Sequence, residues 1–437
     1  MSRTATVIPA SSTQRRVVLN VNVLDVGAAP GAWTLDDVHA HSFVDLDHFV
    51  NVARIAERGT LDAFFLADGP GFWENPRIKP PRALEPSVIL AAVGAATENI
   101  GLIGTASTTF NDPYDLAERF LSLDYVSGGR VAWNVVTTYS PTAAANFGFD
   151  QIPDRDYRYR RAEEFVAVVG ELWASARTGL PVSHHGEFFD IDARLRVPPS
   201  AQGTPPLIQA GGSPAGRDLA GRTAHGVFSA ELTLDAARRH YRHVKDIARG
   251  AGRNPDDVKI LPGLITVIGS TEAEAIARHD ALRAHVPARF GWDRLGLTLG
   301  VPLSELDLDQ PIPQSLLDGP PDPKNFGGSL GFRESVVGLA RERNLTVAQL
   351  LRELDGGGGH RAVIGTPEQV ADTIEEGFLA EAADGFNLMP DAFPSGLETF
   401  VDEVVPLLRR RGLFREDYEE RTLRDRLGIP LSGVPVA

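Results

Sequence analysis

Short apolar runs alternate with longer amphipathic stretches along most of the chain. Residues 17–24 are mostly apolar, and from about residue 43 to 58 apolar residues recur at helical spacing. The first pattern is typical of a strand buried on both faces, and the second of a helix that packs one face on a sheet. Seven more apolar runs follow. These predicted strands lie at residues 61–67, 100–106, 127–138, 206–210, 226–229, 258–268 and 385–389.

Each predicted strand is followed by a stretch with helical periodicity. The predicted helices lie at about residues 43–58, 86–97, 113–125, 157–174, 214–223, 234–249, in the stretch that opens at 270–274, and at 397–411. Several of them open with proline, which suits the first turn because its missing N–H has no intrahelical partner there. Eight strand–helix pairs predict a (β/α)8 TIM barrel that spans the chain as a single domain, 1–437.

Three segments depart from this alternation. Residues 1–16 are expected to be a flexible lead-in, and residues 412–437 a C-terminal extension. Residues 289–331 form an insertion rich in Pro, Gly and Asp in which no regular pattern is found, and two helical stretches follow it. The four glycines 356–359 predict a flexible hinge. The connection before the fifth strand, rich in Gly, Pro and His, is expected to be a long loop.

The fourth predicted strand contains both apolar residues typical of a buried strand and a polar candidate for a ligand contact. A Gly-Gly pair at 128–129 ends the preceding helix, and a Val-rich strand follows. A buried amide needs a hydrogen-bond partner, so Asn134 in this strand is a candidate ligand contact. Side chains alternate between the two faces of a strand, which places Trp133 on the opposite face, between the barrel and its helices.

Polar residues follow several predicted strands at their carboxyl ends, where barrel enzymes carry their active sites. They are Asp68, Thr105, Asn134, Thr137 and Ser213. Taken one at a time, each has an ordinary structural explanation as a helix cap, a β-former or a satisfied core amide. Their occurrence at successive strand ends favours one shared pocket.

The segment 209–216 is the best candidate for an anion-binding loop. Its glycines allow close approach of the backbone, and the N–H groups of the following helix carry the positive end of the helix dipole, which suits a phosphate. Ser213 adds a hydroxyl. Arg155 and Tyr159 lie four residues apart, so both can reach one anion from the same helical face. The alternative for this pair is an ordinary solvated, Arg-rich face.

The histidines predict no metal centre. His39 and His41 resemble the H-x-H pair of metal-dependent barrel hydrolases, but they lie well past the first strand and lack further ligands, so a surface or capping role is favoured. His184, His185 and His360 are expected in solvated loops, with a mobile active-site residue as the alternative. The common hydrolase and nucleotide-binding motifs are also missing.

Composition narrows the functional class. The chain has 437 residues, a formal charge of −15, a pI near 5.2 and no cysteine. An acidic chain is not expected to bind nucleic acid, and without cysteine any redox chemistry must come from a bound cofactor. The apolar runs are too short to span a membrane, and the amino terminus has no apolar core of signal-peptide length. These features predict a cytoplasmic protein.

Several motifs together resemble one family. They lie at residues 105–114, 127–138, 146–148, 209–211, 365–372, 406–415 and 422–428. In combination they are similar to the nitrilotriacetate monooxygenase component A-like group of the bacterial luciferase-like flavin-dependent monooxygenases, and the likeness extends over nearly the whole chain. The resemblance implies a luciferase-like TIM barrel.

The resemblance also implies a function. Members of this group are oxygenase components that take reduced FMN (FMNH2) from a separate NAD(P)H:flavin reductase and use O2 to oxygenate a small organic compound through a flavin hydroperoxide. A homodimer or homotetramer is implied as well. Two alternatives stay open: a deazaflavin-dependent hydride-transfer enzyme of the same superfamily, and a flavin-binding protein that has lost catalysis.

The family's flavin contacts fall on Asp68, Thr105, Asn134, Tyr159 and Ser213, and the last two would hold the phosphate.

This chain departs from the family pattern in two places. Arg155 stands where relatives have a histidine, and it can still pair with a phosphate. Ala28 and Ala29 replace a His pair that lies near the substrate in relatives, so the substrate or the proton handling is expected to differ. His360 matches a family position and is the candidate catalytic residue.

Overall fold

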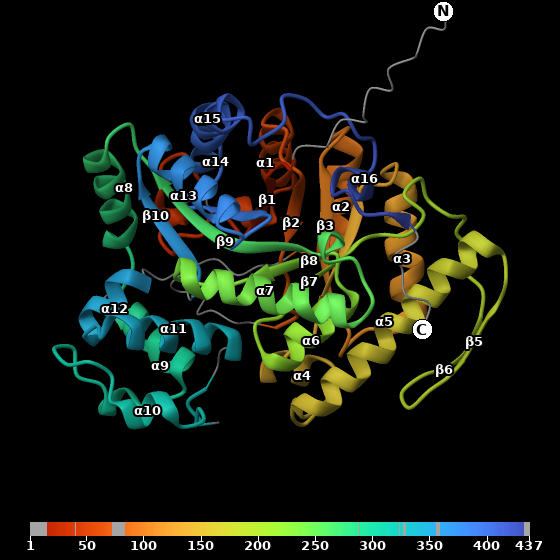
Figure 1. Ribbon diagram of the computed structural model, residues 1–437, viewed down its shortest axis with the longest axis horizontal. Coiled ribbons are helices and arrows are strands. Elements are labelled where there is room, and N and C mark those ends of the chain that lie inside the picture. The colour runs from red at the N-terminus through yellow and green to blue at the C-terminus, as the bar shows by residue number, and fades with distance from the viewer. Residues whose placement is uncertain are drawn as a thin grey trace, which may run out of the picture.

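The fold is a closed parallel barrel surrounded by helices (Figure 1). The computed structural model describes residues 15–39, 41–71, 84–287, 289–322, 324–326, 329–354 and 359–431. The eight barrel strands are β1 (Val18–Val23), β2 (Ala63–Leu66), β3 (Gly101–Ser107), β4 (Val131–Val136), β7 (Leu207–Ala210), β8 (Gly226–Ser229), β9 (Lys259–Ile268) and β11 (Gly385–Pro390). They pair in this order, and β11 returns to β1 to close the barrel. The predicted barrel and all eight predicted strands are confirmed.

One more strand of the same sheet, β10 (Arg361–Gly365), lies outside the closed barrel. The sequence pattern did not predict it. It pairs only with the carboxyl half of β9, whose ten residues also pair with β8 and β11 at successive positions. Its side chains are mostly half-buried, so the continuous burial that marks the barrel strands is missing. Because β9 is longer than its barrel neighbours, its carboxyl half remains available to pair with β10.

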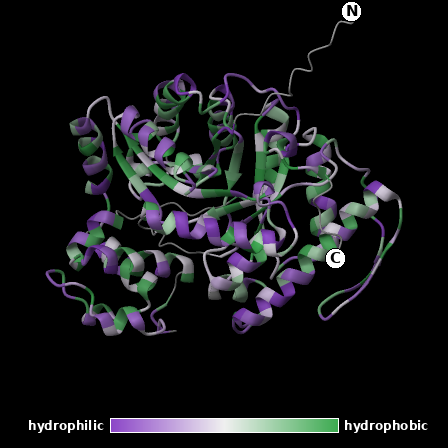
Figure 2. Cartoon of the chain, in the orientation of Figure 1, coloured by the Kyte–Doolittle hydropathy of each residue, from purple (hydrophilic) through white to green (hydrophobic). Residues whose placement is uncertain are grey.

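The helices that follow the strands cover the outside of the barrel. They are α1 (Leu46–Arg58), α2 (Pro86–Ala96), α3 (Pro113–Val126), α5 (Arg155–Thr178), α6 (Pro214–Thr223), α7 (Leu234–Gly250), α8 (Glu272–Ala284) and α13 (Pro367–Leu379). Figure 2 shows hydrophobic residues concentrated on the strands and hydrophilic ones on the outer helix faces. No helix in the described part of the chain is long and apolar enough to cross a membrane.

The last predicted helix is divided into α14 (Ser395–Thr399), a π-helical turn η5 (Phe400–Val404) and α15 (Val405–Arg410). Pro406 follows the π turn, and it has no N–H to donate to the preceding turn. The proline therefore explains why a continuous α-helical pattern gives way to a wider turn there.

The expectation of an irregular insertion at residues 289–331 is wrong. The segment contains α9 (Arg289–Leu299), the short α10 (Gln314–Asp318) and the start of α11 (Leu330–Arg343), and α12 (Val347–Leu354) follows. These helices share an apolar cluster of their own, separate from the barrel core. Prolines and glycines at the helix ends conceal the periodicity. The predicted glycine hinge falls largely outside the described residues.

The long loop expected before the fifth barrel strand contains an antiparallel hairpin. It consists of β5 (Val182–His185) and β6 (Asp190–Ala193), and Figure 1 shows it projecting from the barrel beside α5. Most of its side chains are exposed or half-buried, so it has little of the apolar alternation by which a strand is recognised.

Candidate active site

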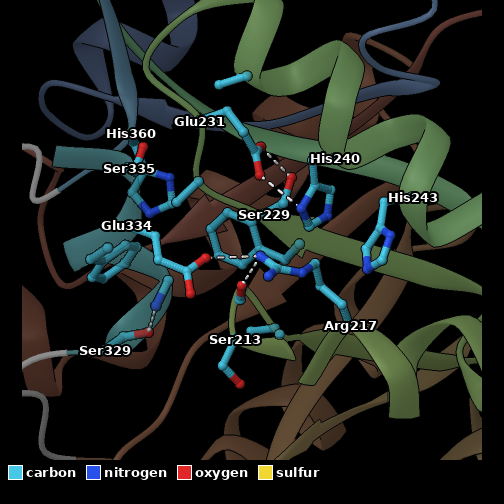
Figure 3. A pocket seen from close by; sticks show the side chains of 18 of the residues that line it. Ser213, Arg217, Ser229, Glu231, His240, His243, Ser329, Glu334, Ser335 and His360 are labelled. Carbon is cyan, nitrogen blue, oxygen red and sulfur yellow. Dashed lines mark hydrogen bonds and ion pairs between the residues drawn. The ribbon is translucent and has the colours of Figure 1, made fainter. Parts of the chain in front are cut away.

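A cavity of about 680 Å³ opens at the carboxyl ends of β4, β7 and β8, beneath the amino-terminal ends of α7 and α11 (Figure 3). This volume lies within the roughly 300–1,000 Å³ that ligand pockets occupy. Three of the residues predicted for the site, Tyr159, Ser213 and His360, line the cavity, as does the strand-end residue Thr137.

The candidate anion-binding loop leads into the start of α6. Ser213 is the N-cap of α6, and its Oγ accepts a hydrogen bond from the Gly216 N–H at 3.1 Å. The hydroxyl of Tyr159, from α5, lies 3.1 Å from the same oxygen. Pro214 at the first turn fixes the helix start, so backbone N–H groups, two hydroxyls and the positive end of the helix dipole face one point.

Arg155 and Arg217 both lie near this loop. Arg155 is the first residue of α5, with its guanidinium carbon 5.7 Å from the centre of the Tyr159 ring. Arg217, on α6, lines the cavity and donates to the Gly212 carbonyl and, at 3.0 Å, to Glu334 of α11. The sequence did not predict Arg217 as a site residue. In a short helix with several arginines, the sequence does not show which side chain faces the cavity.

The remaining predicted contacts lie at the neighbouring strand ends. The Thr105 hydroxyl donates to the Leu66 carbonyl at 2.8 Å, and the Asn134 side-chain amide donates to the Thr105 hydroxyl at 2.9 Å. Both residues are buried, and Asp68 is half-buried two residues past β2. Among the described residues, these three are not part of the cavity lining. The structure thus joins Thr105 to Asn134 and Tyr159 to Ser213, as two separate pairs.

Asn134 Oδ1 and Gln209 Oε1 are buried acceptors with no hydrogen-bond partner among the described residues. Such atoms are costly unless a donor reaches them. Both belong to strands that end at the cavity, so the orphaned acceptors mark this end of the barrel as a place for a ligand with N–H groups.

The expectation that His360 lies in a solvated loop is wrong. It is 6% exposed, stacks on Phe228 with ring centroids 5.2 Å apart and meets the edge of Phe332. Burial, together with the smaller effect of the positive charge of Arg294, lowers the pKa of His360 to about 4. His360 is therefore neutral at physiological pH, and its Nδ1 has no partner among the described residues.

His39, His41 and His184 are not among the residues that line the cavity. His39 and His41 are exposed, and the described residues contain no group of three His, Asp or Glu side chains arranged to hold a metal ion. His184 lies 3.3 Å from both Glu164 and Glu171 of α5, an arrangement that joins the hairpin to the helix.

Sequence reasoning also missed a polar group on the far wall of the cavity. Ser229 is the last residue of β8, Glu231 lies two residues beyond it, and His240 and His243 lie on α7. They line the cavity together, although no motif connects them in the sequence.

A parallel barrel with a ligand-sized cavity at the carboxyl ends of its strands is the architecture of the barrel enzymes, whose active sites lie at that end. The chain matches the model of the luciferase-like monooxygenase family over residues 27–384 and belongs to that family.

Two curated relatives and one solved structure are similar over nearly their whole length. Nitrilotriacetate monooxygenase component A from Aminobacter aminovorans is 40% identical, with 92% of this chain and 94% of the relative covered. N-acetyl-S-(2-succino)cysteine monooxygenase from Bacillus subtilis (strain 168) is 36% identical, with 96% and 98% covered. The structure of EDTA monooxygenase (EmoA) from Chelativorans sp. BNC1 has a TM-score of 0.80 and is 36% identical, with 95% and 99% covered. The chain is accordingly a flavin-dependent monooxygenase, and these relatives favour this function over the deazaflavin alternative.

Proposed function

We propose that this chain is the oxygenase component of a two-component system, which receives reduced FMN from a separate NAD(P)H:flavin reductase and uses O2 to oxygenate a small organic compound. The observation that carries the choice of FMN is the loop at the start of α6. Its serine cap, the Tyr159 hydroxyl and the positive end of the helix dipole suit a single phosphate group.

The residues present fit the flavin at both ends. Tyr159 and Ser213 would hold the phosphate, with Arg155 as the nearby cation. Asp68, Thr105 and Asn134 would contact the ring, and the orphaned Asn134 Oδ1 suits its N–H groups. When bound, reduced FMN supplies the electrons that activate O2. The task of the chain is to bind and orient the reactants and to exclude water, to which the rings of Phe228 and Phe332 contribute at the cavity wall.

The cellular setting is part of the same proposal. We place the protein in the cytoplasm, as a homodimer or homotetramer that binds no nucleic acid and no membrane. The three relatives described above are named for nitrilotriacetate, N-acetyl-S-(2-succino)cysteine and EDTA, and these polycarboxylates are the compounds to test first.

Anaerobic titration with reduced FMN, followed by flavin fluorescence, tests the cofactor. A Ser213→Asp substitution keeps a good N-cap, so the helix is retained, but places a negative charge beside the phosphate. Like charges about 4 Å apart cost on the order of 1–4 kcal/mol, so affinity should fall at least about fivefold. Thr271→Asp, at the N-cap of α8, is the matched control and should bind as wild type does.

The reaction is tested by oxygen consumption with a generic flavin reductase over a panel that includes nitrilotriacetate and N-acetyl-S-(2-succino)cysteine. A substrate should suppress the hydrogen peroxide released in its absence. Failure of the wild-type chain to bind reduced FMN would overturn the proposal, and equal affinity in Ser213→Asp would remove Ser213 from the phosphate site.

A further inference from the structure

The far wall of the cavity contains a carboxylate–imidazole pair. Glu231, which follows β8, has its Oε1 3.1 Å from His240 Nδ1 on α7, and its Oε2 accepts a hydrogen bond from the Ser229 hydroxyl at 2.7 Å. Figure 3 shows the two side chains directed toward one another, with the Ser229 hydroxyl bonded to the second carboxylate oxygen. The side chains of His240 and Glu231 are 6% and 10% exposed. Both carboxylate oxygens of Glu231 thus have a partner, which fixes the orientation of the side chain.

This arrangement defines the protonation of the imidazole. A neutral imidazole has one N–H donor and one acceptor nitrogen, and a carboxylate only accepts. Nδ1 therefore carries the proton that it donates to Glu231, and Nε2 has the lone pair. Nε2 is buried and has no hydrogen-bond partner among the described residues. An oriented imidazole with a vacant acceptor in a cavity wall is the geometry of a general base.

Neither of the other two histidines that line the cavity, His243 and His360, is paired with a carboxylate in this way. His360 lies between aromatic rings, and a nearby arginine opposes its protonation, so nothing stabilises an imidazolium there. His243 is exposed at the rim of the cavity, one turn of α7 beyond His240. Only His240 combines burial with a carboxylate that compensates a gained proton.

Four neighbouring groups act on His240 besides its own burial. Burial lowers the pKa of His240, the charge of Glu231 raises it, Arg217 of α6 and His243 of α7 lower it, and Glu334 of α11 raises it. Arg217 and Glu334 are themselves an ion pair at 3.0 Å, so their effects oppose one another. Glu231 is consequently the partner that governs whether His240 can take up a proton.

We propose that His240 is the general base of this cavity and Glu231 its positioning residue, which together accept the proton of a substrate that bears a weakly acidic N–H or O–H group. This inference rests on the proposed function. In the step, the N–H or O–H bond breaks heterolytically, its electron pair stays on the substrate atom, and the proton moves to Nε2. Nδ1–H stays bonded to Glu231, whose negative charge balances the imidazolium. The proton passes to water when the product leaves.

The first test needs neither flavin nor substrate. In the full-length chain labelled with ¹⁵N-histidine, a His240→Gln variant assigns the His240 signals. The wild type should show the neutral Nδ1–H tautomer at pH 7. Glu231→Gln keeps the size of the side chain but removes its charge, so the pKa of His240 should fall. His185→Gln, on the exposed hairpin, is the matched control and should change neither signal. An Nε2–H tautomer, or an unchanged pKa in Glu231→Gln, would overturn the inference.

The second test uses the compound of the panel that gives the highest coupled turnover. His240→Gln should lower kcat by about 10²–10⁴-fold, as loss of a general base does, while affinity for reduced FMN stays within about twofold. The base must be unprotonated, so kcat/KM falls below the pKa of His240, and in Glu231→Gln this acid limb should move to lower pH. A merely structural role would change KM or stability without moving the limb.

The two proposals fail in different ways. A kcat of His240→Gln within twofold of wild type, or an acid limb that stays in place in Glu231→Gln, would overturn the inference while the monooxygenase activity stands. A wild-type chain that oxygenates no compound of the panel would count against the proposed function, and the tautomer of His240 would still be decided by the first test.

Discussion

Neighbouring residues of the fourth strand have opposite surroundings. The Trp133 ring is fully buried among Phe120, Phe165 and Trp173 on the helix side of β4, which confirms the predicted packing role. Asn134 faces the other way and meets Thr105 of β3. One strand therefore contributes a packing residue to the outer layer and a candidate flavin contact to the barrel end, because the side-chain period of a strand is two.

A single glycine makes room for His360. A Cβ at Gly263 of β9 would overlap the imidazole and lie 2.8 Å from its Cε1. Gly263→Ala should therefore displace the ring from Phe228, lower kcat and destabilise the protein by about 1–3 kcal/mol through overpacking. Kinetics and urea unfolding measure both effects. In a His360→Ala background the same substitution should cost much less, and an equal cost there would contradict the proposed overlap.

The junction between α3 and β4 depends on one buried carboxyl group. Asp124, near the end of α3, accepts hydrogen bonds from the Val131 N–H at 2.9 Å and from Gln202 at 2.6 Å, and Ser200 donates to its other oxygen. The carboxyl thus ties the helix to the first residue of the strand and to the loop before β7. Burial raises the pKa of Asp124 to about 6, although these hydrogen bonds lower it.

This raised pKa predicts a pH-dependent stability. The unfolded carboxyl ionises near its ordinary pKa of 3.8, so between about pH 4 and pH 6 the folded chain retains a proton that the unfolded chain has lost. The contribution of Asp124 to the free energy of unfolding therefore falls as pH rises through this window, by about 1.4 kcal/mol per unit of pKa difference.

Asp124→Asn keeps most of the hydrogen bonds but cannot ionise. Relative to wild type, its free energy of unfolding should increase from pH 4 to pH 6 and then level off. Urea unfolding at several pH values measures this difference. A difference that stays constant over the window would show that Asp124 does not titrate there.

At the scale of the whole molecule, residues 412–431 of the C-terminal extension close the end of the barrel opposite the cavity. Leu423, Leu427 and Ile429 pack against the amino-terminal residues of the barrel strands, among them Val18 and Ile103. Arg424 is 1% exposed, and its guanidinium donates to the Thr204 carbonyl at 2.9 Å. The extension is therefore a part of the core, and the barrel depends on residues far from its strands in sequence.

Leu423→Ala should destabilise the protein by about 2–5 kcal/mol, because Leu423 is fully buried and its removal leaves a cavity between the extension and the barrel. The control is Leu379→Ala on α13, whose side chain is 66% exposed and which should cost less than about 0.5 kcal/mol. Thermal and urea unfolding measure both variants, and equal stabilities would contradict a structural role for the extension.

The sequence by itself determined the eight barrel strands and the serine-capped loop that starts α6. These features follow from local rules, since strand burial and helix capping depend on residues only a few positions apart. The tertiary structure alone decided that Glu231 meets His240, that Arg217 turns into the cavity and that Gly263 lies beneath His360. These contacts join different elements, and their geometry depends on the positions and orientations of α7 and α11 on the barrel. A local sequence pattern contains no information about how distant elements pack.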